Sequence, residues 1–336
     1  MPPLFSILIP VYNRPGEVAE LLESLSGQVG APAYEVIIVE DGSTLPCQSV
    51  VEQFSGLMPV KYKVKENGGP AQARNYGAQY AAAPWLIILD SDVILPPGYL
   101  NTVATALGAN PACALFGGPD AASPHFTPVQ KAVNYAMTSV LTTGGIRGQK
   151  TATNKRFYPR SFNMGCRKAL FDAVGGFDAG MRFGEDIDFS LRCYQAGASV
   201  ALFREAFVYH KRRVDLKKFF KQVFNSGMAR IDLTLRHPAS LKAVYMLPSG
   251  FVIALVIGLV ALWFIPVPLL SLLALFLLVI WADAWRSSRN LKVALLAIPA
   301  VFTQLIGYGS GFLYAGIRYL FTGKRHANAF SRSFYQ

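Results

Sequence analysis

The chain is poor in charged residues, and the shortage is local. Charged residues make up 15% of the 336 positions, against 52% for hydrophobic residues. Residues 243–282 and 293–317 contain no charged side chain. A helix needs about 20 apolar residues to cross a bilayer, so this composition excludes an ordinary water-soluble protein. It predicts spans at 244–265 and 268–284, and either a third span or a re-entrant segment bending near Gly307–Gly311 within 293–317. Buried core helices of such length are the weaker interpretation.

Cysteine is also scarce, and no two cysteines form a C-x-x-C pair. The four are scattered along the chain, at Cys47, Cys113, Cys166 and Cys193. This spacing favours neither a zinc site nor a disulfide framework, so we predict reduced thiols. The first residues also lack the basic segment of a signal peptide. We therefore expect residues 1–240 to remain in the cytoplasm.

Positive charge is concentrated beside the apolar runs. The net charge is +12, and basic residues cluster at 211–221 and 286–292. The positive-inside rule places both clusters on the cytoplasmic side. They can serve topology alone, or they can also bind anionic head groups or a lipid-linked phosphate. Because they flank apolar runs, we expect a membrane partner and no nucleic acid.

Apolar strands alternate with helices in the first third of the chain. Strands are predicted at 5–10, 35–39, 60–64 and 85–89, with helices at 16–25 and 70–83 between them. This alternation predicts an α/β fold with a mostly parallel sheet covered on both faces. Ligands of such sheets bind at the carboxyl ends of the strands. Polar residues follow three of these ends, at Tyr12–Asn13, Asp41 and Asp90–Asp92.

Further elements are less regular. We expect a short strand at 114–116, a mobile loop at 142–161, and helices at 168–174 and 186–196. Phenylalanines of residues 215–235 share one helical face, with lysines elsewhere, which is typical of a helix lying on a membrane surface.

Two acidic motifs carry the candidate chemistry. Asp90-Ser91-Asp92 follows a strand, and its carboxylates suit Mg²⁺ or Mn²⁺ held against substrate phosphates. Glu185 and Asp186 begin a predicted helix; Asp186 is the candidate general base, with Glu185 supporting it. Turn aspartates and helix caps are the plainer interpretation of each motif taken alone.

Three other residues have two interpretations each. Asp41 is either a turn residue before glycine or an acceptor for a nucleobase N–H. Arg74 is either a surface helix residue or a partner for a phosphate or for Asp41. His210 is either an interface histidine or a further contact to a metal or diphosphate.

Several motifs in this order resemble the family 2 glycosyltransferases with the GT-A fold, specifically the membrane-bound bacterial kind. The similarity covers roughly residues 4–212. It rests on Ile7–Asn13, Glu40–Ser43, Asn67–Pro70, Ala73–Asn75, Leu89–Asp92, Asn163–Gly165, Val174–Asp178, Gly184–Asp186 and Tyr209–His210.

The resemblance implies an inverting transfer of sugar from a nucleotide-diphosphate donor of the UDP or GDP type, with Mg²⁺ or Mn²⁺ as cofactor. Asp186 would be the base, and Asp92, Asp90 and His210 would hold the metal. The implied nucleotide- and donor-binding residues are Pro10, Val11, Tyr12, Asn13, Asp41, Asn67, Arg74, Asp90, Ser91, Asn163 and Met164.

One departure from the motifs of the family narrows the kind of glycosyltransferase that we expect. Processive synthases of this family carry a Gln-x-x-Arg-Trp motif, which residues 219–230 lack. We therefore expect transfer of one sugar to a hydroxyl of a polyprenyl-diphosphate-linked acceptor in surface polysaccharide or exopolysaccharide synthesis. The alternatives are a polyprenyl-phosphate glycosyl synthase and a non-catalytic membrane scaffold.

The expected organisation has four parts. A GT-A catalytic domain at 1–212 is followed by an amphipathic interfacial region at 213–242, transmembrane helices within 243–320 and a basic tail at 321–336. The expected location is the bacterial inner (plasma) membrane, with several crossings and a cytoplasmic catalytic domain.

Overall fold

The computed structural model describes residues 2–121, 126–143, 156–181, 183–211 and 215–323. These residues form two compact units. The first holds residues up to 121 together with 156–211, and the second holds 126–143 together with 215–323. Residues 126–143 fall within the range 1–212 expected for the catalytic domain, but they belong to the second unit.

The first unit is built on a seven-stranded sheet of order β3-β2-β1-β4-β8-β6-β9. Neighbours among β3, β2, β1 and β4 are parallel, as are β6 and β9, whereas β8 runs antiparallel to both β4 and β6. The mostly parallel sheet confirms the predicted fold class. Its strands are β1 (Phe5–Val11), β2 (Tyr34–Asp41), β3 (Val60–Lys65), β4 (Trp85–Ile88), β6 (Cys113–Gly117), β8 (Met164–Arg167) and β9 (Ser199–Leu202).

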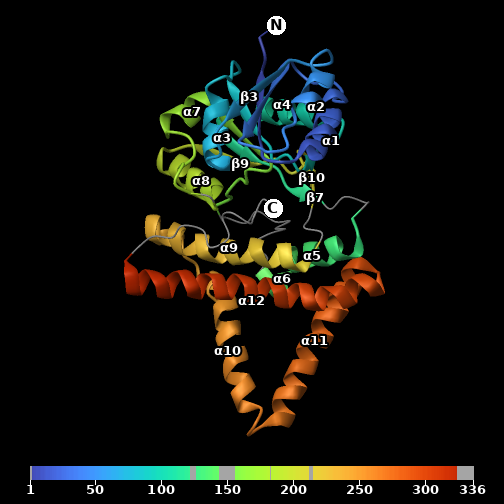
Figure 1. The fold of residues 1–336 in the computed structure, drawn as a ribbon, viewed down its shortest axis with the longest axis vertical. Helices are drawn as coiled ribbons and strands as arrows, with labels where there is room; N and C mark the ends of the chain where they lie inside the picture. Colours follow the sequence, from blue (N-terminus) through green and yellow to red (C-terminus); the bar gives the residue numbers. More distant parts are fainter. Residues whose placement is uncertain (1, 122–125, 144–155, 182, 212–214, 324–336) are drawn as a thin grey trace. The chain divides into compact units, whose positions relative to one another are not determined.

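Helices cover both faces of this sheet (Figure 1). Alternate residues of one strand point to opposite faces, so Val36 and Ile38 enter one core while Ile37 and Val39 enter the other. The first face packs against α1 (Pro15–Ser26), α2 (Gln48–Phe54) and α4 (Tyr99–Ala109). The second packs against α3 (Pro70–Ala78), α7 (Lys168–Ala173) and α8 (Glu185–Gln195).

A second, three-stranded sheet connects distant parts of the same unit. Its order is β5-β10-β7, with β10 antiparallel to β5 and parallel to β7. The strands are β5 (Val93–Ile94), β7 (Asp120–Ala121) and β10 (Val208–His210). Because β5 directly follows Asp92, its pairing with β10 places His210 beside the first acidic motif.

The second unit is entirely helical where the structure describes it. Buried residues of α5, α9, α11 and α12 form its core, which includes Val133, Phe219, Ile280 and Val301. Its elements are α5 (Pro128–Thr138), α6 (Val140–Thr143), α9 (Leu216–Arg236), the 3₁₀ turns η1 (Pro238–Ser240) and η2 (Ala243–Tyr245), α10 (Leu247–Ala261), α11 (Pro266–Ser288) and α12 (Leu291–Thr322).

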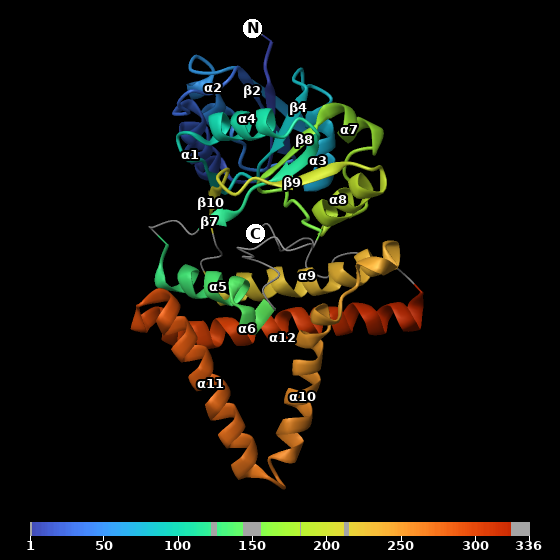
Figure 2. The ribbon, with the colours of Figure 1, turned by 180° about the vertical axis from the view of Figure 1, so that it is seen from behind.

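Helices α10 and α11 form a hairpin that projects from the other helices of this unit (Figures 1 and 2). Their outer surfaces are apolar and exposed; Val256, Leu272 and Leu275 are each more than half exposed. By length and hydropathy, α11 and α12 each suffice to cross a membrane, whereas α10 is a shorter apolar helix.

The last helix differs from the expectation of a bend. α12 continues as one helix of 32 residues through Gly307–Gly311. These glycines allow close packing: a Cβ on Gly311 would lie 2.1 Å from the carbonyl oxygen of Phe224 in α9. A Cβ on Gly309 would lie 2.3 Å from the carbonyl oxygen of Pro248 in α10. The re-entrant bend was therefore a wrong interpretation of glycines that serve helix contact.

Most predicted elements agree with the structure to within two residues at each end. The helix predicted at 70–83 ends earlier, at Ala78. Of the predicted mobile loop, residues 144–155 lie outside the described residues. Its end, including Arg160, is described and forms an isolated bridge with Asn163.

Candidate functional site

The site is built from residues at the carboxyl ends of β1, β2 and β4. At the end of β2, the Asp41 carboxylate accepts hydrogen bonds from the backbone N–H groups of Gly68 and Gly69, at 2.9 and 2.7 Å. It also accepts one from Lys65 Nζ at 2.7 Å. Asn67 donates its side-chain amide to the Asp41 carbonyl at 2.7 Å. Asp41 therefore orders the loop that leads into α3.

Gly42 is required for this arrangement. Its φ is +70°, in the left-handed region that glycine adopts without a Cβ penalty. A Cβ at this position would also lie 2.6 Å from the backbone nitrogen of Asn67. The close approach of the two loops thus depends on the glycine of the Glu40–Ser43 motif.

Asn13 performs a similar role at the end of β1. It has a positive φ of 54°, and its side-chain oxygen accepts hydrogen bonds from Leu45 N at 2.8 Å and Thr44 Oγ1 at 3.2 Å. Its own N–H donates to Ser43 Oγ at 2.8 Å. Asn13 therefore ties the ends of β1 and β2 together, and Tyr12 beside it is half-buried.

At the end of β4, two aspartates and a histidine converge. Asp90, Asp92 and His210 each offer one ligand atom within 4.8 Å of the others. His210 Nε2 lies 3.2 Å from Asp92 Oδ1, and the imidazole stacks on Phe162 with ring centroids 4.7 Å apart. Lys211 N donates to the Asp92 carbonyl at 3.0 Å, which extends the β5–β10 pairing to the aspartate itself.

The donor set fits a divalent cation. Carboxylate oxygens are preferred ligands of Mg²⁺ and Mn²⁺. An imidazole nitrogen is a ligand of transition metals, so it can join the carboxylates on Mn²⁺. His210 Nδ1 is buried without a hydrogen-bond partner among the described residues. A buried imidazole nitrogen without a hydrogen-bond partner is costly unless another group engages it.

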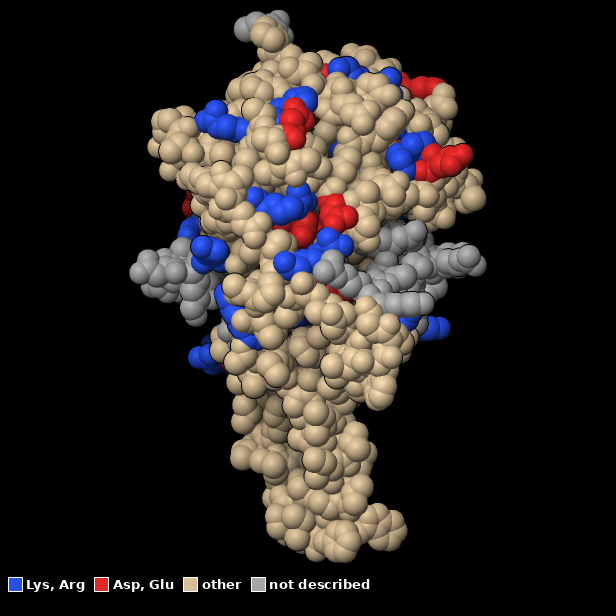
Figure 3. All heavy atoms as spheres, turned by 90° about the vertical axis from the view of Figure 1, so that its left-hand side faces the viewer, with Lys and Arg blue, Asp and Glu red and all other residues tan. Residues whose placement is uncertain are grey.

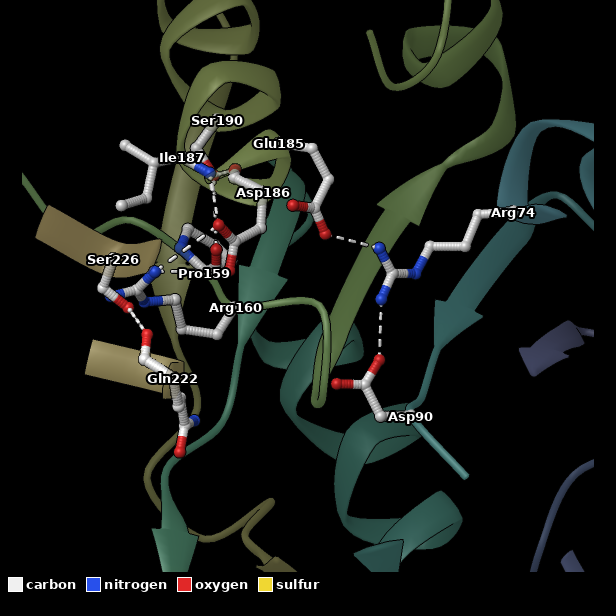
Figure 4. A network of polar contacts seen from close by, with 10 residues as sticks. All are labelled: Arg74, Asp90, Pro159, Arg160, Glu185, Asp186, Ile187, Ser190, Gln222 and Ser226. Carbon is white, nitrogen blue, oxygen red and sulfur yellow. Dashed lines mark hydrogen bonds and ion pairs between the residues drawn. The ribbon is translucent and has the colours of Figure 1, made fainter. Parts of the chain in front are cut away.

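Arg74 joins the two acidic motifs (Figure 4). Its guanidinium donates to Asp90 Oδ1 and to Glu185 Oε1, both at 2.7 Å, and the side chain is 3% exposed. The two carboxylates raise the pKa of Arg74, against the lowering effect of burial. Arg74 therefore pairs with Asp90 and Glu185. Asp41, one of the partners considered for it, is instead held by Lys65 and the backbone amides of Gly68 and Gly69.

Glu185 lies in the first turn of α8 and is 6% exposed. Burial raises its pKa to about 7, and the charge of Asp186 adds to this, while Arg74 opposes it. Burial thus disfavours the charged form of Glu185 despite its contact with Arg74.

Asp186 follows Glu185 but faces a different partner. Arg160 Nη1 lies 3.3 Å from Asp186 Oδ2, and the backbone N–H of Ile187 donates to Asp186 Oδ1 at 2.8 Å. Figure 4 shows the Arg160–Asp186 pair next to the contacts that run from Asp90 through Arg74 to Glu185. The side chain of Asp186 retains 12% exposure, so its carboxylate can still be reached.

Some predicted donor-binding side chains lie in the core. Asn163 is 0% exposed, accepts a hydrogen bond from Tyr99 Oη at 2.6 Å and donates to the Ala206 carbonyl at 2.8 Å. Met164 is 0% exposed and packs in the second-face core. Val11 is 2% exposed and Ser91 is 7% exposed. The structure does not bring the side chains of Asn163, Met164 and Val11 to the site surface, whereas Pro10 remains partly exposed.

Three basic residues of the site were missed by sequence reasoning. Arg14 Nη1 lies 3.7 Å from Asp92 Oδ2, Lys65 binds Asp41, and Arg160 faces Asp186. Arg14 follows a strand end and Lys65 ends one, so their positions carried a usable signal. Arg160 lies in a segment without helical or strand periodicity, which offered none.

A mostly parallel α/β sheet with an Asp-x-Asp motif at a strand end is the architecture of the GT-A fold. The comparison with known families agrees with that class. The chain belongs to glycosyl transferase family 2, whose sequence model matches residues 6–175.

Curated relatives are glycosyltransferases of actinobacteria, among others. Validoxylamine A glucosyltransferase of Streptomyces hygroscopicus subsp. limoneus is 31% identical over 61% of this chain and 51% of its own length. Pre-mycofactocin glycosyltransferase of Mycobacterium tuberculosis (strain ATCC 25618 / H37Rv) is 29% identical over 69% of this chain and 48% of its own. The chain spans about half the length of these relatives.

Solved structures share the fold at low identity. The mannosyltransferase PcManGT from Pyrobaculum calidifontis, in complex with GDP-Man and Mn²⁺, has a TM-score of 0.64 at 16% identity, covering 91% of this chain and 88% of that one. S. aureus TarS 1–349 in complex with UDP has a TM-score of 0.51 at 18% identity, covering 95% and 92%. At these identities the likeness concerns the fold.

Proposed function

We propose that the protein is a membrane-attached, metal-dependent glycosyltransferase that moves one sugar, with inversion, from a nucleotide-diphosphate sugar to an acceptor hydroxyl. The observation that carries this proposal is the convergence of Asp90, Asp92 and His210 within 4.8 Å, linked through Arg74 to the acidic start of α8. The proposed donor carries UDP or GDP, as in the complexes of TarS and PcManGT.

In this proposal the two acidic motifs divide the work. Asp92, Asp90 and His210 would hold Mg²⁺ or Mn²⁺, which stabilises negative charge on the departing diphosphate as a Lewis acid. Asp186 takes the proton of the acceptor hydroxyl, whose oxygen bonds to the anomeric carbon as the bond to the diphosphate breaks. Arg160 holds the Asp186 carboxylate in place at 3.3 Å.

Arg74 and Glu185 position these groups. Arg74 fixes the orientation of Asp90, and its second contact holds Glu185 at the start of α8. Asp41, together with Lys65, shapes the loop at 67–69 on the side where the nucleotide base would bind. The Asp41 carboxylate already accepts three hydrogen bonds, from Lys65, Gly68 and Gly69. A contact with the base would therefore use the lone pairs that remain free of these three donors.

The proposed acceptor is a hydroxyl of a polyprenyl-diphosphate-linked glycan in surface polysaccharide synthesis. Two features support a lipid-borne acceptor: the exposed apolar hairpin of α10 and α11, and the basic residues at 211–221 and 286–292. The proposed location is the bacterial plasma membrane, with the catalytic unit in the cytoplasm.

The base assignment is tested with Asp186→Asn in the full-length, detergent-purified protein. Loss of a general base slows such reactions about 10²- to 10⁴-fold, measured as nucleoside-diphosphate release with donor and acceptor. Asp172→Asn, an exposed partner of Lys168 on α7, is the matched control. Turnover of the Asp186→Asn variant at the rate of this control would refute the assignment.

The metal assignment is tested by thermal melting. Ligands that bind only the folded state raise its melting temperature, so Mn²⁺ with a nucleoside diphosphate should raise that of the unaltered protein and not that of Asp92→Asn. An equal rise in the melting temperature of both proteins would show that the metal binds at another site. No rise in either, together with no turnover, would favour a non-catalytic scaffold.

A polyprenyl-phosphate glycosyl synthase is the second candidate. Its acceptor is already anionic and needs no general base, and the basic residues near the apolar runs favour it. Assays with bare polyprenyl phosphate and with a lipid-linked sugar distinguish the two. Transfer to the phosphate, undiminished in Asp186→Asn, would favour this second candidate.

A further inference from the structure

The turn between α10 and α11 has an unusual composition for a loop that would emerge into water. Residues 262–269 contain no charged side chain and no hydroxyl or amide side chain. Trp263 and Phe264 are 89% and 79% exposed at the tip of the hairpin. In Figure 3 no Lys, Arg, Asp or Glu is visible on the projecting hairpin. The indole N–H of Trp263 is the one side-chain hydrogen-bond donor of this turn.

Most backbone N–H donors of the turn are satisfied within it. Trp263, Phe264 and Ile265 donate their N–H groups to carbonyls of Val260 and Ala261, at 2.9 to 3.3 Å. Pro266 and Pro268 begin α11 and have no N–H to leave unpaired. Internal satisfaction of polar backbone is what hydrocarbon demands and water does not.

Helix α10 and the charge-free part of α11 are each short for a complete crossing. α10 has 15 residues, which gives about 22 Å, and the charge-free part of α11, residues 266–282, gives about 26 Å. The hydrocarbon core is about 30 Å thick. Both views of the ribbon show the two helices meeting at the tip and diverging toward α12 (Figures 1 and 2), and this inclination reduces the depth further.

The polar groups of the hairpin gather at its wide end. Asp283 of α11 accepts a hydrogen bond from Tyr135 of α5 at 2.8 Å. Arg286, Arg289 and Lys292 follow within one short stretch, and Lys242 precedes α10. Positive charge marks the cytoplasmic side of a membrane protein. The start of α10 and the end of α11 therefore lie on that side.

Helix α12 runs across this wide end. Asn290 links it to α11, and Ser249 Oγ at the start of α10 donates to the carbonyl of Gly309 at 3.3 Å. The two contact points are separated along α12 by about 27 Å at the helical rise. A helix that spans the distance between the two legs cannot run parallel to them, although its composition alone would allow a crossing.

From these observations we infer that α10 and α11 form a hairpin that enters the bilayer from one face and ends within the far leaflet, without an aqueous loop on the opposite side. α12 then lies along the membrane plane, and the chain returns to the side from which it entered. This inference rests on the membrane attachment proposed above and is independent of the sugar-transfer chemistry.

The test uses single cysteines and a membrane-impermeant maleimide. Trp263→Cys and Val267→Cys place a thiol at two exposed tip positions, and Ser287→Cys at the exposed base of α11 is the matched control. The native cysteines are buried, and the unaltered protein sets their background. Labelling is compared in sealed right-side-out vesicles, in sealed inside-out vesicles and after detergent.

The inference expects the tip cysteines to remain at background in both vesicle orientations and to react only in detergent. The base cysteine should react in inside-out vesicles. Labelling of either tip cysteine in right-side-out vesicles would show a loop outside and overturn the inference. Release of the unaltered protein by alkaline carbonate would overturn it together with the membrane attachment, while nucleoside-diphosphate release would still test the catalytic proposal separately.

Discussion

The two units of this protein treat polar and apolar side chains in opposite ways. The first unit buries charge: Arg74, Glu185 and Asp41 are each less than 10% exposed and are held by ion pairs or hydrogen bonds. Among its described residues, the exposed large hydrophobic side chains are scattered along the chain, at Val29, Leu45, Leu57 and Val64. In the second unit, the α10–α11 hairpin presents an almost continuous exposed apolar surface, which includes Ile257, Leu270 and Leu275.

This difference between the two units indicates that their surfaces face different environments. Burying charge is expensive unless partners and hydrogen bonds compensate for lost hydration, so such clusters in the first unit mark a site where charge is needed. A large contiguous apolar surface marks an interaction with another apolar phase. This contrast is in keeping with the charged donor and the membrane attachment proposed above.

The largest effect is expected from removing the cation at the centre of the buried cluster. Arg74→Met leaves Asp90 and Glu185 without their shared partner, and breaking a buried pair costs about 3–5 kcal/mol of unfolding free energy. Thermal melting and hydrogen exchange should show this loss in β1, β4 and α8, with little change in α9 and α12.

The matched control is Lys168→Met, which breaks an exposed pair with Asp172. Exposed pairs contribute about 0–1 kcal/mol. If Arg74→Met melted at the temperature of this control, the buried cluster would not be a stabilising feature of the first unit.

A smaller effect, confined to the second unit, is expected from Gly311→Ala. The new Cβ would meet the Phe224 carbonyl at 2.1 Å and force α9 and α12 apart. Overpacking of this kind costs about 1–3 kcal/mol. Hydrogen exchange should rise in residues 216–236 and remain unchanged in the sheet of the first unit.

Gly258→Ala in α10 is the control, because a Cβ there meets nothing within 4 Å. Replacing a helical glycine with alanine favours the helix by about 0.5–1 kcal/mol. Equal exchange in the two variants would contradict close packing between α9 and α12.

A third effect is a pH dependence of stability that belongs to the first unit. Burial raises the pKa of Glu185 to about 7, so between about pH 4.5 and 7 the folded chain binds a proton that the unfolded chain has lost. This contribution is fully present below that window and is lost as the pH rises through it. Glu185→Gln never ionises, so its melting temperature should fall less over the same window.

The comparison is made on melting curves collected across the window for both proteins, with Glu52→Gln, exposed on α2, as a control for loss of a carboxylate. Parallel profiles for the unaltered protein and Glu185→Gln would mean that Glu185 does not take up a proton on folding.

Local patterns in the sequence predicted the elements that carry the site. The apolar strands before Tyr12, Asp41 and Asp90 correspond to β1, β2 and β4, which are neighbours in the sheet. Parallel neighbours end at one edge, so polar residues after them had to lie together. The fold class followed from the same alternation, and the resemblance added the grouping of His210 with Asp92.

Pairings between distant residues could not be predicted in this way. Arg74 and Glu185 are 111 positions apart in the sequence. They meet because β8, which precedes α8 in the chain, inserts antiparallel between β4 and β6. Nothing local indicated that Lys65 would occupy Asp41 and leave Arg74 for Asp90. Likewise, glycine at 307–311 has the same local signature in a bend and in a close helix contact, and only the partner helix α9 distinguishes them.

The pairing of β5 with β10 has a consequence for the order of synthesis. Asp92 is made early and His210, 118 positions later in the sequence, comes near the end of the first unit. At about 5–20 residues per second, the ribosome needs on the order of ten seconds to travel from one to the other. An incomplete chain thus holds the two carboxylates without the imidazole. The candidate cation site is completed only shortly before α10 and α11 are translated, so the proposed catalytic centre and the proposed membrane anchor arise almost together.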